Sequence, residues 1–79
     1  MTIEQFSDLI YSLFEVTPSN EITPATDFKE LDEWDSLLAL EIIALIDEEL
    51  DISLNGDDIR NVNTIEDLYL VVMKKKKGE

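Results

Sequence analysis

The longest uninterrupted apolar pattern in the sequence runs from Ser36 to Leu50 and reads SLLALEIIALIDEEL. It contains neither glycine nor proline, and its apolar residues recur at the three- and four-residue spacing of a helix face. It falls short of the roughly 20 apolar residues that a membrane-spanning helix needs. The stretch therefore predicts a long central helix around which a small helical domain is organised.

Each end of the chain carries a further helix signal. Thr2 is followed three residues later by Gln5, which fits a capping box in front of a helix from about residue 3 to residue 15. Thr64 and Asp67 offer a similar capping pattern in front of a last helix. The apolar positions of that helix are Ile65, Leu68, Tyr69 and Val72, and the lysines just beyond it complement its dipole.

The stretch between residues 16 and 35 has a different character. Pro18 and Pro24 forbid a continuous helix, and the surrounding Thr, Ser and Asn residues favour local turns. We expect a long loop with one short helical turn near residues 28–31, capped by Asp27. Its expected apolar anchors under the helices are Ile22, Phe28 and Leu31.

A short helix is expected between the central and the last one. Asn55 and Gly56 mark a turn, and Asp57 and Asp58 could then cap a helix over residues 58–61. Strand-like alternation is limited to the four residues Asp51–Leu54. The sequence thus predicts an all-α fold, a four-helix bundle with three longer helices and a short third helix.

The charge is large and unevenly distributed. The net charge is −13, and all but one of the 19 acidic residues fall in residues 1–73, where Lys29 and Arg60 are the only bases. Such a body repels nucleic acid and anionic membranes and attracts basic protein surfaces. We expect a domain over residues 1–73 followed by a basic, solvated tail over 74–79. The N-terminus lacks the features of a signal or transit peptide, so we expect a cytosolic protein. We also expect a monomer.

The chain lacks the residues on which most catalytic sites depend. It has no histidine, the commonest general base and metal ligand, and no cysteine, so it has no thiol nucleophile of its own. A self-contained catalytic site is therefore not expected. Residues 51–56 imitate the start of a calcium-binding EF-hand loop, but its twelfth position falls on Val62, which cannot supply the closing carboxylate. A turn between helices explains that segment better than a metal site.

The central helix divides into two faces when its residues are placed at about 100° per step. One face is the expected core stripe and consists of Ala39, Ile42, Ile43, Ile46 and Leu50. The opposite arc mixes apolar and acidic residues, and consists of Ser36, Leu37, Leu40, Glu41, Ala44, Asp47 and Glu48. Leu38 and Leu45 lie between the two. A helix that is apolar over so much of its circumference is either fully buried or has an outward patch for a partner. Full burial is hard in a chain of 79 residues, which favours the patch.

Ser36 stands at the start of this helix and has two readings. A serine in front of an apolar run is commonly a simple N-cap. Asp35 could fill that role instead, which would leave the serine side chain facing solvent. A helix N-terminus also stabilises an attached phosphate, and Trp34, Asp35 and Leu37 surround the hydroxyl with contact residues.

The motif Asp35-Ser36-Leu37, together with Glu41 and the acidic run 47–49, resembles the acyl carrier protein family. The resemblance extends over essentially the whole chain, through its length, acidity and helix order. It implies that a separate transferase esterifies Ser36 with 4′-phosphopantetheine taken from coenzyme A in the presence of Mg²⁺. The chain would then shuttle acyl or aminoacyl groups as thioesters between enzymes of fatty-acid, polyketide or specialised biosynthesis. Asp35 and Leu37 would flank the prosthetic group.

The same resemblance implies how partner enzymes dock. Their basic groups would meet Glu41, Asp47 and Glu48, and Leu37, Leu40 and Ala44 would supply apolar contact. Two departures from the fatty-acid members are Trp34 before the motif and Leu38 two residues after the serine, where an acid is common. These departures favour a specialised carrier in which Trp34 and Leu38 select a dedicated partner. The alternative is an unmodified acidic helical adaptor for a basic protein, which would not need the Ser36 hydroxyl.

Overall fold

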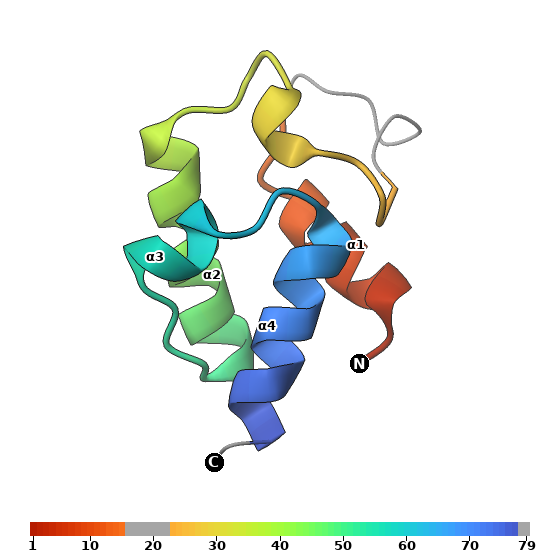
Figure 1. Ribbon diagram of the computed structural model, residues 1–79, viewed down its shortest axis with the longest axis vertical. Coiled ribbons are helices and arrows are strands. Elements are labelled where there is room, and N and C mark those ends of the chain that lie inside the picture. Colours follow the sequence, from red (N-terminus) through yellow and green to blue (C-terminus); the bar gives the residue numbers. More distant parts are fainter. Residues whose placement is uncertain (16–22, 78–79) are drawn as a thin grey trace.

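The computed structural model describes residues 1–15 and 23–77, and its elements are helical. The α-helices are α1 (Ile3–Tyr11), α2 (Ser36–Leu50), α3 (Gly56–Arg60) and α4 (Ile65–Lys77), and a 3₁₀ turn, η2, covers Phe28–Glu30. The predicted all-α bundle with a short third helix is confirmed. Figure 1 shows α4 between α1 and α2, with α3 lying across α2 and η2 above the bundle.

The described residues contain no β-strand and only one isolated bridge, between Asp27 and Thr64. Next to it, the N–H of Glu66 donates to the carbonyl of Pro24 at 2.8 Å, which ties the long loop to the start of α4. Within the same residues, no helix is long and apolar enough to cross a membrane.

Capping groups set the beginnings of the helices as the sequence predicts, with one change. The Thr2–Gln5 capping box is present, Asp27 caps η2, and Thr64 and Asp67 exchange hydrogen bonds at the start of α4. The exception is α3, which begins at Gly56 and not at 58. Its cap is Asn55, whose side chain accepts the N–H of Asp58 while Asp58 accepts the N–H of Asn55.

Two helix ends differ from expectation. Helix α1 stops at Tyr11 and not near residue 15, because the Ser12 hydroxyl bonds the carbonyl of Leu9 and the next two N–H groups bond three residues back. This tighter turn buries Phe14. Helix α4 continues through Lys77, so the lysines expected beyond it lie within it. Lys75 pairs with Asp58 of α3 at 3.2 Å, and a separate role for residues 74–79 stays a prediction.

The core is a single cluster to which all four α-helices and η2 contribute. Its largest fully buried side chains are Phe6, Ile10, Phe28, Ile42, Ile46, Ile52, Ile65, Leu68 and Val72. Tyr69 of α4 meets Phe6 of α1 edge to face at 5.4 Å, and its hydroxyl donates to the carbonyl of Met1 at 2.9 Å. Of the expected loop anchors, Phe28 is fully buried and Leu31 half-buried. Pro18 and Ile22 lie outside the described residues.

The inward face of α2 is rotated slightly from the predicted stripe. Leu38, Ile42 and Ile46 are buried, while Ala39, Ile43 and Leu50 are half-buried and pack against the core from the side. A spacing of four residues places these three buried side chains almost directly above one another. The rotation turns the Ala39 and Ile43 side of α2 toward a groove beside α3.

Candidate functional site

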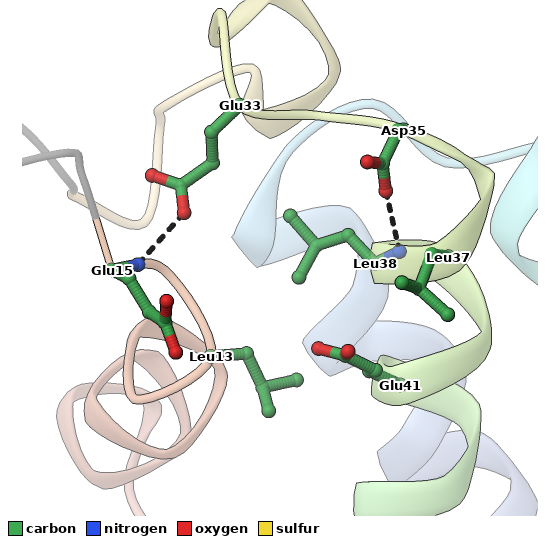
Figure 2. A pocket seen from close by; sticks show the side chains of 7 residues that line it. All are labelled: Leu13, Glu15, Glu33, Asp35, Leu37, Leu38 and Glu41. Carbon is green, nitrogen blue, oxygen red and sulfur yellow. Dashed lines mark hydrogen bonds between the residues drawn. The ribbon is translucent and has the colours of Figure 1, made fainter.

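Ser36 is the first residue of α2, and its side chain is exposed. The N-cap is the residue before it, Asp35, whose Oδ1 accepts the N–H of Leu38 at 2.8 Å (Figure 2). This bond satisfies one of the N–H groups that every helix leaves unpaired at its start. Within residues 1–15 and 23–77 the Ser36 hydroxyl has no hydrogen-bond partner. The capping role therefore falls to Asp35, and the serine oxygen remains accessible.

A groove of about 630 Å³ lies on one side of Ser36, between α2 and α3. Its α2 wall carries Ala39, Leu40 and Ile43 below the serine, and Gly56, Ile59 and Arg60 of α3 face them. Trp34 lines the same groove and is held edge to face against the buried Phe28, with ring centroids 5.1 Å apart. The groove thus begins at the serine and continues along a mostly apolar wall.

On the other side of Ser36, a smaller hollow of about 210 Å³ separates the end of α1 from the start of α2. Figure 2 shows the carboxylates of Glu15, Glu33, Asp35 and Glu41 around it. Glu33 accepts the N–H of Glu15 at 2.7 Å, which joins the two segments. Among the residues that the structure describes, no group of three or more histidines, cysteines or carboxylates is placed to hold a metal ion. The four carboxylates around the hollow give this side of the serine a negative charge toward an approaching molecule.

The outward face of α2 has the predicted mixture of apolar and acidic side chains. Leu37 and Leu40 are 62% and 63% exposed, which is high for large apolar residues. The other exposed residues of this face are Glu41, Ala44, Asp47 and Glu48. Apolar side chains ringed by charge form the kind of surface on which proteins dock.

The structure does not support one of the predicted partner contacts. Leu38 is only 6% exposed and belongs to the core, so it cannot offer a docking surface in this conformation. The reason is the rotation of α2, which brings position 38 into line with Ile42 and Ile46. Trp34 is half-buried and lines the groove, so any contact that it makes with a partner or ligand occurs there.

The comparison with protein families shows to which family the chain belongs. The model of the phosphopantetheine attachment site matches residues 4–72, which extend from α1 into α4. The chain belongs to this family. It is therefore an acyl carrier protein family member, and its cofactor is covalently attached 4′-phosphopantetheine. Comparison with curated proteins and with solved structures found no match.

The residues of this carrier fit that cofactor. Attachment requires an accessible hydroxyl, and the Ser36 side chain is exposed while Asp35 caps the helix. The N-terminus of the 15-residue helix α2 favours a negatively charged phosphodiester next to it. The adjacent groove provides room beside the serine.

Sequence reasoning missed two residues of this region, Lys29 and Arg60. Both line the groove, although one comes from η2 and the other from the end of α3. Their only signal in the sequence is that they are the sole bases among the first 73 residues. Their proximity depends on how η2 packs against α3, which no local pattern encodes.

Proposed function

We propose that this carrier holds acyl or aminoacyl intermediates on a 4′-phosphopantetheine attached to Ser36 and shuttles them between partner enzymes. The observation that carries the proposal is the exposed Ser36 hydroxyl at the first position of α2, with Asp35 as the cap. When bound, the prosthetic group supplies the terminal thiol on which such groups travel as thioesters. The chain has neither cysteine nor histidine, so a borrowed thiol supplies chemistry that it lacks.

In this proposal the carrier is not an enzyme but the substrate of a phosphopantetheinyl transferase. A new bond forms between the Ser36 oxygen and the phosphorus that bears the pantetheine. The phosphoanhydride bond of coenzyme A breaks, adenosine 3′,5′-bisphosphate leaves, and the serine proton is released to a base. The chain has no histidine, so that base is a carboxylate near Ser36, a group of the transferase or solvent.

The exposed face of α2 is the proposed docking surface for the transferase and for the enzymes that load and unload the carrier. Leu37, Leu40 and Ala44 would give apolar contact, and Glu41, Asp47 and Glu48 would attract basic partner surfaces. Exposed charge pairs contribute only about 0–1 kcal/mol each, which suits a carrier that must leave each enzyme quickly. Partners of opposite charge would still find this face rapidly.

The departures of the sequence from fatty-acid carriers, Trp34 before the motif and Leu38 two residues after the serine, are our reason to propose a specialised member of the family that serves polyketide, aminoacyl or surface-glycan chemistry. We place the carrier domain at residues 1–73 and expect a separate, basic role for residues 74–79, although α4 continues through Lys77. We also expect a cytoplasmic monomer.

The test is the intact mass of the chain after incubation with coenzyme A, Mg²⁺ and a broad-specificity phosphopantetheinyl transferase. We expect the mass of one phosphopantetheinyl group to be added to the wild type but not to Ser36→Ala. Ser53→Ala, which removes another exposed hydroxyl, is the matched control and should be modified normally. An unmodified wild type with an active transferase would overturn the proposal and favour a helical adaptor without a prosthetic group.

A further inference from the structure

The fold brings together the only two basic residues among the first 73. Lys29 lies in η2 and Arg60 at the end of α3, and the Lys29 ammonium donates to the Arg60 carbonyl at 3.0 Å. Both side chains line the groove that begins at Ser36. Both basic residues of the otherwise acidic segment 1–73 therefore lie at this one groove.

The surroundings of Lys29 leave its charge uncompensated. Its side chain is half-buried, and in the described part of the chain no carboxylate oxygen lies within 4.0 Å of its ammonium. The ammonium has three N–H donors, and the bond to the Arg60 carbonyl uses one of them. Arg60 differs, because its guanidinium already pairs with Asp57 at 2.8 Å and is largely exposed.

A purely structural role explains only part of this arrangement. A lysine that bonds the last carbonyl of a helix complements the negative end of that helix. Helix α3 has only five residues, so this effect is small. It does not account for a lysine that lines a groove next to Ser36 and whose ammonium keeps two further N–H donors. A partly buried cation without a counter-ion is a ready binding group for an anion.

We propose that Lys29, with Arg60 beside it, binds an anionic group borne on Ser36. Two parts of the carried group have this chemistry: the phosphodiester that joins it to the serine, and a carboxylate on the acyl cargo. In the second case the groove would favour dicarboxylic acyl groups over neutral ones of the same length. The inference rests on the proposed function, because it requires the prosthetic group on Ser36.

The test compares melting temperatures of four forms of the intact chain: unmodified, with phosphopantetheine alone, with a butyryl group and with a succinyl group. Butyryl and succinyl have equal carbon chains, but only succinyl ends in a carboxylate. Lys29→Gln keeps a donor for the Arg60 carbonyl and removes the charge. Lys76→Gln, an exposed lysine of α4, is the control for net charge, and Lys29→Arg restores the charge.

If the phosphodiester is the ligand, attachment of phosphopantetheine should shift the melting temperature of the wild type upward by about 2–4 °C relative to the shift in Lys29→Gln. Lys29→Arg and Lys76→Gln should behave like the wild type. If a cargo carboxylate is the ligand, the same gap should separate succinyl from butyryl forms. Equal changes in all four proteins, in both comparisons, would overturn the inference. Intact masses show separately whether Ser36 was modified, so failure of the proposed function would be recognised before any melting curve is recorded.

Discussion

The Asp35 carboxylate accepts the backbone N–H of Leu38 at 2.8 Å, one turn into α2, and so caps the helix from the position just before Ser36. Asp35 therefore stabilises the first turn of the helix, and the hydroxyl of Ser36 stays accessible.

The cap should be measurable in the stability of the domain. We expect Asp35→Ala to lower the free energy of unfolding by about 1 kcal/mol, because it leaves the Leu38 N–H without its partner. Urea denaturation of the unmodified protein measures this. Asp32→Ala removes an exposed carboxylate that caps no helix and should have little effect. Equal losses in the two variants would mean that the Asp35 bond is not what stabilises α2.

The acidic face of α2 should control the rate of modification. Glu41→Lys reverses one charge on this face and should reduce kcat/KM of the transferase by about tenfold at low salt, since it weakens attraction to a basic partner. Glu66→Lys makes the same change at an exposed position of α4. Steady-state kinetics at low and high salt measure both. A rate that fell equally in the two variants would show that net charge matters and the face does not.

The buried hydroxyl of Ser7 predicts a stabilising substitution. It lies in α1 without a hydrogen-bond partner among the described residues, and an unsatisfied polar group costs free energy when buried. Ser7→Ala should therefore raise the free energy of unfolding by about 1 kcal/mol, helped by the higher helix propensity of alanine. Chemical denaturation against Ser53→Ala, an exposed serine, provides the comparison. A destabilised Ser7→Ala would indicate that the hydroxyl does find a partner.

The end of α2 depends on an unusual backbone conformation. Asp51 has φ 55° and ψ 40°, a left-handed position that glycine adopts without steric cost. We expect Asp51→Val to destabilise the domain by about 1–2 kcal/mol relative to Asp51→Gly. Thermal melting of the two variants tests this order. The reverse order would mean that the helix ends in another conformation in solution.

Asp67 should make stability depend on pH in the acid range. Hydrogen bonds from the N–H groups of Asn63 and Thr64, in that order of importance, hold the pKa of its carboxyl below the ordinary value of 3.8. A group with a lowered folded-state pKa gives stability that is complete above its unfolded pKa and is lost as pH falls through the folded pKa. The contribution should therefore fade below about pH 4. Melting curves of wild type and Asp67→Asn should differ above that pH and converge below it.

The sequence predicted the parts of this fold that depend on local chemistry. The Thr2–Gln5 box, the Asp27 cap and the Thr64–Asp67 pair were all correct, because each cap is formed by residues close in the chain. The family was recognised from the motif at residues 35–37 together with the length, acidity and helix order of the chain, and the family match confirms it.

The predictions that were wrong concern features that tertiary packing determines, such as the buried face and the end of a helix. Leu38 was expected at the edge of the partner face, but the rotation of α2 places it in the core. Helix α1 was expected to reach residue 15, yet it ends at Tyr11, and the turn that follows places Phe14 in the core. The gathering of Lys29 and Arg60 at one groove depends on contact between segments about 30 residues apart, which periodicity cannot show.

The position of Trp34, held against Phe28 in the groove wall, has a practical consequence for experiments on this carrier in solution. Trp34 is the only tryptophan of the chain, and it lies in the wall of the groove that begins at Ser36. Indole emission responds to the polarity of its surroundings and to nearby quenching groups. The chain therefore contains its own optical probe, through which a change in the polarity of this groove wall can be followed in real time without an added dye.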